Sequence, residues 1–507
     1  MRLPSLLATL LLGASSAGAA EKNVIFFITD DESPTLGCYG DDAAATPAID
    51  ALAADGTVFL NAFATTASCS ASRSVVMSGL HNHLNGQFGH QHHYHKFGSF
   101  YDVAQLALPR VMAEEGYRTG HIGKYHVAPE VVYHFETYVK GNGRNAVEMA
   151  ENVREFITSK EDERPFFLYF GTSDPHRGGG KDQNAPGKHK PDLFGNRPNQ
   201  GNFEGVEEVI YDPNDVIVPP FLPDTEACRL ELAHYYQSVA RIDQGVARLV
   251  SILKEADLYD KTMIVFTSDH GMAFQGGKTT VFEGGLRVPF VVRNPYEKKR
   301  GVRSEALLSH VDITPSILDF AGGLDSETNG PTRLRTSREL YTELGLWKFI
   351  EKENRNGGRK FTSYHGRSWM GILGEEDDLS RDSIHASHTF HEIQMYYPMR
   401  VYRDRKYKLI WNIAHGLPYP SASDLWSSST WLAQWDQGED APYGQMTVGE
   451  YMHRPAFELY DIEIDPWEST NLAENPEHAE TLEAYQAKLK KFQRDYHDPW
   501  VMKWDYE

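Results

Sequence analysis

The stretch NVIFFITDD, residues 23–31, decides the fold class of this chain of 507 residues. A short apolar run without alternation is typical of a strand that is buried on both faces, as at the centre of a parallel sheet. Ligands of α/β sheets bind outside the carboxyl ends of such strands, and here that end carries Asp30 and Asp31. The stretch therefore predicts a central strand that delivers two acids to a ligand site.

Two later stretches repeat this design. PFFLYFGTSDPH, residues 165–176, and TMIVFTSDHG, residues 262–271, each run from an apolar strand into an aspartate and a histidine. Helical patterns lie between them, over residues 146–159 and 230–256. Alternating strands and helices predict an α/β domain in which helices sandwich a mostly parallel sheet.

The composition changes after residue 322. Residues 325–360 are polar and charged, with a helix-like piece over 337–353, and we interpret them as an insertion. MRVYRDRKYKLIWNI, residues 399–413, has the alternation of an antiparallel hairpin, and residues 478–497 form an amphipathic helical pattern. These segments predict a smaller C-terminal α+β domain built on an antiparallel sheet, so the expected division is 1–20 for a signal peptide, 21–395 for the catalytic domain and 396–507 for the C-terminal domain.

The first twenty residues, MRLPSLLATLLLGASSAGAA, are typical of a cleaved secretory signal. Their apolar core is too short to span a membrane, and no run of eighteen apolar residues follows, so we expect no membrane span. The chain has no Asn-x-Ser/Thr acceptor for glycosylation, which favours a bacterial source. We expect an exported protein, periplasmic or secreted in a bacterium and lysosomal in a eukaryote.

Charge and cysteine content exclude other classes. The chain has 50 basic and 71 acidic residues, a net charge of −21, so most of its surface repels nucleic acid and anionic membranes. An anionic substrate needs a local cationic pocket. Three cysteines are too few for the disulfide framework of an exported protein of this length, and at least one of them is unpaired.

Acids and histidines follow three of the predicted strands, as Asp30-Asp31, Asp174-x-His176 and Asp269-His270. Each set alone is more often a helix N-cap or a turn. Three sets on one edge of a sheet repel one another unless a cation lies among them, and oxygen-rich sites suit Ca²⁺ or Mg²⁺. The sequence therefore predicts a metal site at this edge.

Two further stretches bear reactive side chains. SCSASRSVVMSGL, residues 68–80, predicts a helix that begins near Cys69 and buries its Val-Val-Met run. In GYRTGHIGKYH, residues 116–126, Lys124 and His126 are two apart and project to one face of an extended segment. A packed cysteine, a solvated lysine and a core histidine are the alternative interpretations.

Taken together, CSASR with its following Ser-Gly, GYRTGHIGKYH and the acidic strand ends resemble the signatures of the type I sulfatases, a family of the alkaline phosphatase superfamily. The resemblance implies an alkaline-phosphatase-like α/β fold. It also implies that a formylglycine-generating enzyme or an anaerobic sulfatase-maturating enzyme oxidises Cys69 to Cα-formylglycine. One Ca²⁺ is then held by Asp30, Asp31, modified Cys69, Asp269 and His270.

The same resemblance assigns catalytic roles. Arg73 and Lys124 fix the hydrated formylglycine and balance the acidic cluster. Lys278 and His176 bind sulfate oxygens, and one of them protonates the leaving group. His126 takes the proton of the second hydroxyl so that sulfate is released.

Three positions depart from the usual pattern. Position 71 is Ala where most members have Pro, which leaves the modification of Cys69 to be tested. His270 stands where the most similar branch has Asn, so it either binds Ca²⁺ or orients the site. Lys278 replaces an arginine and offers a point charge in place of a planar fork.

Substrate residues are expected from FHEIQMYYPMR, residues 390–400, and from the histidine-rich residues 81–103. Both resemble the sulfatase branch that removes N-sulfate from non-reducing-end glucosamine in heparan-type saccharides. His391, Glu392 and Arg400 are the sugar-binding candidates, although the segment could simply join the two domains. His90, His92, His93 and His95 are compatible with transition-metal binding, but we favour a pocket wall or packing role.

Other functions stay open at this point. An O-sulfatase for another sulfated glycan, a phosphonate or phosphodiester hydrolase, and a binding protein on an inactive scaffold share parts of the pattern. The expected partners are a sulfated saccharide and a maturation enzyme, without nucleic acid or a membrane. The sequence also leaves room for a homodimer.

Overall fold

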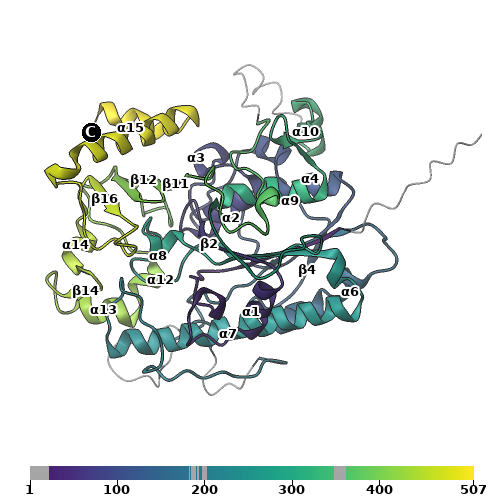
Figure 1. The fold of residues 1–507 in the computed structure, drawn as a ribbon, viewed down its shortest axis with the longest axis horizontal. Coiled ribbons are helices and arrows are strands. Elements are labelled where there is room, and N and C mark those ends of the chain that lie inside the picture. Colours follow the sequence, from purple (N-terminus) through teal and green to yellow (C-terminus); the bar gives the residue numbers. More distant parts are fainter. Residues whose placement is uncertain are drawn as a thin grey trace, which may run out of the picture.

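A computed structural model of the protein describes residues 22–181, 183, 190, 193–196, 203–346 and 361–506. The predicted signal peptide lies outside the described residues, as does the part of the predicted insertion from 347 to 360. The described part contains two principal sheets, each covered by helices (Figure 1).

The larger sheet has eight strands in the order β4-β3-β5-β1-β6-β7-β2-β8. Among these strands, β7 alone runs antiparallel to its neighbours, which confirms the predicted mostly parallel sheet. The strands are β1 (Asn23–Thr29), β2 (Thr57–Phe63), β3 (Arg118–Gly123), β4 (Thr137–Val139), β5 (Phe166–Gly171), β6 (Thr262–Ser268), β7 (Phe290–Arg293) and β8 (Val302–Ser309).

Helices cover both faces of this sheet (Figure 1). One face carries α1 (Pro47–Ala54), α5 (Ala146–Asn152), α6 (Arg154–Thr158) and the 30-residue α7 (Glu226–Glu255). The other carries α2 (Cys69–Ser78), α4 (Leu108–Glu114) and α9 (Ile313–Ala321). The single helix predicted over residues 146–159 is two helices that adjoin at Val153. No helix among the described residues is long and apolar enough to cross a membrane.

Strand β1 lies between β5 and β6, and every residue of β1 is buried. Ile28 stands opposite Gly171 of β5, and Thr29 stands opposite Ser268 of β6. The parallel register therefore brings the segments that follow β1, β5 and β6 to the same edge of the sheet. This is the arrangement that their sequences predict.

The smaller sheet is antiparallel, with the order β11-β12-β13-β16. Its strands are β11 (Ser383–His388), β12 (Met399–Asp404), β13 (Tyr407–Asn412) and β16 (Phe457–Asp461). The predicted hairpin is β12–β13, and the predicted helix is α15 (Ala479–Asp495), which packs Tyr485 and Leu489 against this sheet. The expected domain boundary at 395/396 falls between β11 and β12, two strands of the same sheet.

Short elements complete the described chain. Within the expected insertion, α10 (Ser337–Glu343) begins at a capping box formed by Thr336 and Glu339, and the rest of the helix predicted to residue 353 lies partly outside the described residues. The remaining elements are α3 (Asn82–Asn85), α8 (Glu283–Leu286), α12 (Ser423–Trp426), α13 (Ser429–Trp435), α14 (Val448–Met452), β9 (Leu324–Asp325), β10 (Gly330–Pro331), β14 (Pro442–Tyr443) and β15 (Met446–Thr447).

A buried ion-pair cluster joins the two sheets. Glu283 of α8 accepts hydrogen bonds from Arg403 of β12 and Lys408 of β13, and Lys408 also contacts Glu468 at 2.6 Å. Burial raises the pKa of Glu283, but Arg403 and Lys408 outweigh it and lower the pKa to about 2. The cluster thus connects the smaller sheet to α8, in the segment between β6 and β7, and removing one of its members leaves an unpaired buried charge.

Candidate active site

Helix α2 places Cys69 in its first turn. Ser68 is the N-cap, but its Oγ makes no cap hydrogen bond and lies 3.0 Å from His391 Nδ1. All ten residues of α2 are buried, and the helix ends at Gly79, whose φ of 63° is a conformation that glycine adopts without strain. A helix N-terminus carries a partial positive charge, which stabilises a thiolate or another anion at Cys69.

The acids that follow β1 and β6 meet at Cys69. Cys69 Sγ lies 3.7 Å from Asp31 Oδ1 and 3.3 Å from His270 Nε2. Asp31 has a φ of 66°, uncommon for a residue other than glycine, and its backbone N donates to Asp269 Oδ1 at 3.0 Å. Such outliers concentrate at functional sites. The structure thus brings together Cys69, Asp31, Asp269 and His270, whose ligand atoms all lie within 4.8 Å of one another.

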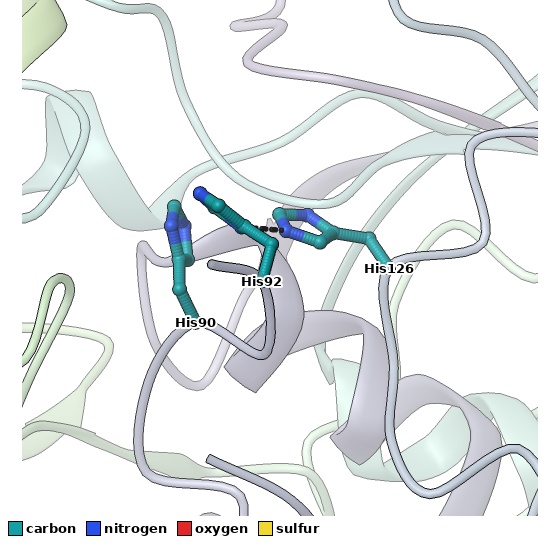
Figure 2. A group of neighbouring side chains, drawn as sticks. All are labelled: His90, His92 and His126. Carbon is teal, nitrogen blue, oxygen red and sulfur yellow. Dashed lines mark hydrogen bonds between the residues drawn. The ribbon is translucent and has the colours of Figure 1, made fainter. Parts of the chain in front are cut away.

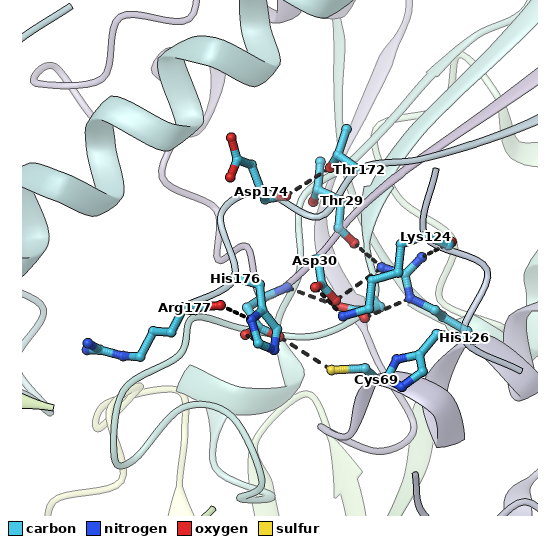
Figure 3. Close-up of polar contacts among 12 residues, drawn as sticks. Thr29, Asp30, Cys69, Lys124, His126, Thr172, Asp174, His176 and Arg177 are labelled. Atoms are coloured by element: carbon cyan, nitrogen blue, oxygen red, sulfur yellow. Dashed lines mark hydrogen bonds and ion pairs between the residues drawn. The ribbon is translucent and has the colours of Figure 1, made fainter. Parts of the chain in front are cut away.

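Two basic side chains, Arg73 and Lys124, bind the buried carboxylates. Arg73, one turn after Cys69, donates to Asp269 Oδ2 at 3.0 Å and to Asp30 Oδ1 at 3.2 Å. Lys124, directly after β3, donates to the other oxygen of Asp30 (Figure 3). Arg73 is completely buried, so it acts as a fixed counter-charge between two strand ends.

Lys278 joins a third set of groups. Its Nζ lies 2.9 Å from each of Asp31 Oδ2, His176 Nε2 and Asp424 Oδ2. Asp424 is not among the site residues predicted from the sequence, since it belongs to the short helix α12 and follows no strand. Its stretch, SASDLW, carries no motif, so only the fold reveals that its carboxylate reaches the site.

Charges around Cys69 shift its ionisation. Burial raises the pKa of the Cys69 thiol, but Lys124, Lys278 and His270 outweigh it and hold the pKa well below its usual range. Burial raises the pKa of Asp269 to about 7 against the opposing effects of His270 and Arg73. In the absence of a bound cation, the Asp269 carboxylate is therefore incompletely compensated by its protein partners.

The pKa values of the two catalytic histidine candidates, His126 and His176, are shifted in opposite directions. Burial lowers the pKa of His126 well below its ordinary value, so its ring is neutral. Burial and Lys278 also lower the pKa of His176, but Asp31 and Asp30 lie close and raise it on balance. Groups whose surroundings push their pKa values apart are suited to the opposite roles of base and acid.

Asp174 does not join the cluster. Its carboxylate binds Arg144 at 3.1 Å and Arg241 at 2.9 Å, and Figure 3 shows it pointing away from Cys69. His176, two residues later, points back toward Cys69 and places its Nδ1 on the carbonyl oxygen of Arg177. The strand end after β5 therefore contributes a histidine to the site and uses its aspartate to hold the loop.

The three sugar-binding candidates lie in different surroundings. His391 is buried beside Ser68, and its ring centroid is 3.8 Å from that of His90. Glu392 is half-buried and accepts a hydrogen bond from Ser423 Oγ at 2.6 Å. Arg400 is 2% exposed and pairs with Asp498, 98 residues later, with Nε at 2.5 Å from the carboxylate. His391 and Glu392 thus flank the site, whereas Arg400 is engaged in a buried ion pair.

The donor set fits a hard divalent cation. Carboxylate oxygens of Asp31 and Asp269 converge with Cys69 and His270, Asp31 also lies in a second group with Asp30 and His176, and carboxylate ligands suit Ca²⁺. His270 contributes a softer nitrogen donor. Burial lowers the pKa of His270, but Asp269, Cys69 and Asp31 outweigh it and raise the pKa to about 10, so the ring is protonated while no cation is bound. Chemically, the site can hold a cation, a nucleophile at residue 69, an anion beside Lys278, and an acid and a base.

Comparison with known proteins identifies the relatives of this site. A family model described as "Sulfatase" matches residues 22–323. A human protein named N-sulphoglucosamine sulphohydrolase is 36% identical over 505 residues, which cover 97% of this chain and 94% of the relative. An ulvan-active sulfatase of Formosa agariphila is 27% identical and covers 92% of this chain and 79% of its own.

Solved structures share the fold. One, determined in complex with its substrate D-glucosamine-2-N,6-O-disulfate, superposes with a TM-score of 0.61 and covers 94% of this chain and 98% of its own. Its sequence identity is 18%, so the similarity concerns the fold. A large α/β sheet with a smaller antiparallel sheet is the architecture predicted from the sequence.

Proposed function

Because this chain belongs to the sulfatase family, and is therefore a hydrolase, we propose that it removes N-linked sulfate from the non-reducing-end glucosamine of heparan-type saccharides. The observation that carries the choice of substrate is the 36% identity to N-sulphoglucosamine sulphohydrolase over nearly the full length of both chains. Similarity confined to the α/β domain would support membership of the family but would say nothing about the substrate.

The proposal includes two groups that the chain itself does not encode. Asp30, Asp31 and Asp269 would hold Ca²⁺ together with residue 69, and His270 would bind it or orient it. Cys69 would carry Cα-formylglycine, made by a formylglycine-generating or anaerobic sulfatase-maturating enzyme. When present, these groups supply a hydrated aldehyde with one metal-activated hydroxyl to attack sulfur and a second to release sulfate.

The chain's own residues would position and neutralise the substrate. Lys278 lies in contact with Asp31 and Asp424, so its ammonium has a fixed position, and its third donor, which faces His176, would turn to a sulfate oxygen. Burial raises the pKa of Asp30, but Lys124 and Arg73 lower it on balance and keep Asp30 ionised. Arg73 also orients Asp269, whose ionisation a bound cation would complete. Together with the bound Ca²⁺, the three cations would outweigh the acids that they contact and supply the local positive pocket that an acidic protein needs in order to bind an anion.

Proton transfer would be divided between two histidines. An amine leaves far more readily than an amide anion, so sulfamate cleavage requires a general acid at the nitrogen. His176 Nε2 and Lys278 Nζ lie 2.9 Å apart, and one of the two would supply that proton. His126, neutral because of its burial, would accept the proton whose removal releases sulfate.

Residues of the second half would recognise the sugar. His391 and Glu392 lie beside the helix that bears Cys69 and beside α12, and Glu392 can accept hydrogen bonds from sugar hydroxyls. We retain Arg400 as a third candidate that would act by fixing the segment 390–400, since Asp498 occupies its guanidinium. Export to the periplasm or the exterior is part of the same proposal.

A panel of defined saccharides tests the function. The mature, Ca²⁺-loaded enzyme is incubated with N-sulfoglucosamine, glucosamine 6-O-sulfate and a 2-O-sulfated uronate disaccharide, and free sulfate is measured. We expect release from N-sulfoglucosamine alone. Release only from the O-sulfated sugars would overturn the substrate assignment and favour the O-sulfatase alternative.

A further inference from the structure

Three histidines form a compact group beside the nucleophile and outside the predicted calcium ligands. His90 and His92 come from the loop after α3, and His126 comes from the segment after β3 (Figure 2). One ring nitrogen of each lies within 4.8 Å of the other two, and His92 Nδ1 is 2.8 Å from His126 Nε2. The ring centroids are 4.7 to 5.0 Å apart.

The hydrogen bonding of this group is incomplete. His90 is 5% exposed, and its ring and that of His126 lie close to the Cys69 sulfur, which raises the pKa of each against the effect of burial. Apart from this sulfur, neither ring nitrogen of His90 nor His126 Nδ1 has a hydrogen-bond partner among the described residues. Buried polar atoms in proteins nearly always have a partner, so such orphaned nitrogens require an explanation. Packing alone leaves these atoms unsatisfied, whereas a metal ion would use lone pairs on the rings.

The chemistry of the group distinguishes it from the calcium site. Three imidazoles are borderline-soft ligands that suit Zn²⁺ and related transition ions, whereas the carboxylate oxygens of Asp30, Asp31 and Asp269 suit a hard ion. Zinc–nitrogen bonds of about 2.0–2.1 Å require ring nitrogens more than 3 Å apart, so His92 and His126 would exchange their hydrogen bond for two metal bonds. His92 and His126 are half-buried, which leaves a side for ion entry.

We propose that His90, His92 and His126 form a second, transition-metal site that binds Zn²⁺ next to residue 69, and that occupation of this site inhibits hydrolysis. Binding would engage the lone pair of His126 and prevent it from accepting a proton. The inhibitory part rests on the proposed function of His126, whereas the binding part rests only on the three rings.

Metal titration tests the binding part. The mature full-length protein, kept in excess Ca²⁺, is titrated with Co²⁺ as a spectroscopic probe and with Zn²⁺ by calorimetry. We expect one Co²⁺ per chain with the visible absorption of a tetrahedral nitrogen site, displaced by Zn²⁺. His92→Asn should weaken Zn²⁺ binding at least about tenfold. The matched control is His93→Asn, since His93 is exposed, lies next in sequence and has a φ of 47° that asparagine tolerates.

Sulfate release in the presence of Zn²⁺ tests the inhibitory part. Each variant is compared with its own rate without zinc, and melting temperatures without zinc confirm that both variants fold. Zinc should inhibit wild type and His93→Asn at concentrations at least about tenfold lower than His92→Asn. Equal binding to all three proteins, or no binding to wild type, would overturn the site. Binding without inhibition would overturn the inhibitory part and remove His126 as the base, while sulfate release itself would still support the proposed function.

Discussion

Cys69 Sγ lies 3.3 Å from His270 Nε2, although 201 residues separate them in the chain. Cys69 begins α2 on one face of the large sheet, and His270 follows β6 near its centre. Cys69 follows β2 and His270 follows β6, and these two strands run in the same direction on either side of β7. Their carboxyl ends therefore bring both residues to one edge of the sheet, so the position of residue 69 depends on the sheet as well as on its own helix.

Replacement of Cys69 should remove activity without loss of the fold. In Cys69→Ala, we expect sulfate release to fall on the order of 10⁴-fold, as for other enzymes that lose their nucleophile. Cys38→Ala is the control, because Cys38 is half-exposed and lies apart from the site. Mass analysis of the tryptic peptide around residue 69 should show a loss of about 18 Da in the native host, the change that converts the thiol to an aldehyde. An active enzyme with an unmodified peptide would contradict the mechanism.

Neutralising Asp424 should impair catalysis through Lys278. In Asp424→Asn, the ammonium of Lys278 loses one of its two anionic partners, so we expect kcat/KM to fall about 10- to 100-fold, as for other groups that orient a ligand-binding side chain. Asp440→Asn is the matched control on an exposed residue. Equal activity of the two variants would show that Asp31 alone positions Lys278.

Removal of the metal should lower both stability and activity. An ion present at a hundredfold excess over its Kd stabilises the folded state by about 2.7 kcal/mol, so chelation with EGTA should lower the melting temperature and abolish sulfate release. Added Ca²⁺ should restore both. In Asp31→Asn, a ligand of the predicted site is missing, and its melting temperature should respond little to EGTA. A wild type whose melting temperature ignores EGTA would contradict the predicted calcium site.

Arg400 and Asp498 allow a test of stability against pH. Burial raises the pKa of Asp498, but Arg400 outweighs it and lowers the pKa from 3.8 to about 2. A lowered carboxyl pKa adds stability above the unfolded pKa, about 2 kcal/mol here, and this contribution disappears as the pH falls from about 4 to about 2. The difference in unfolding free energy between wild type and Asp498→Asn should therefore shrink over that range in urea titrations.

Replacement of the arginine separates a structural role from a sugar-binding one. Arg400→Met leaves the Asp498 carboxylate buried and unpaired, so we expect a loss of about 3–5 kcal/mol in unfolding free energy. The double variant Arg400→Met/Asp498→Asn should recover part of that loss. A raised KM with unchanged stability would instead place Arg400 in direct contact with the sugar.

The strand ends were predictable because a buried run followed by acids has few structural solutions. NVIFFITDD and TMIVFTSDHG carry this pattern, and the structure places their acids side by side. Helices with a long apolar stripe, such as α7, were equally predictable from the sequence, although the pattern over 146–159 did not reveal the break at Val153.

Residues that depend on tertiary packing could not be found this way. Asp424 has no apolar run before it, and its role follows only from its distance to Lys278. For Asp174 the prediction from position was wrong. It follows β5 as the clustered acids follow β1 and β6, but its carboxylate pairs with Arg144 and Arg241 and points away from the site. Local pattern identifies a strand end, whereas the partners of its side chain are set by segments far away in the chain.

The ion-pair cluster that joins the two sheets has a consequence for how selectivity can change. The carboxylates of the predicted calcium site, Arg73, Lys124 and Lys278 all precede residue 280, whereas the sugar-binding candidates His391 and Glu392 follow residue 380. Under the proposed function, reactivity and sugar choice are thus encoded largely in separate stretches that meet at Glu283, and Asp424 is the residue of the second stretch that contacts Lys278 of the first. A chimaera that exchanges residues 381–507 between relatives but retains Arg403, Lys408 and Glu468 should inherit its chemistry from one parent and its preferred sugar from the other.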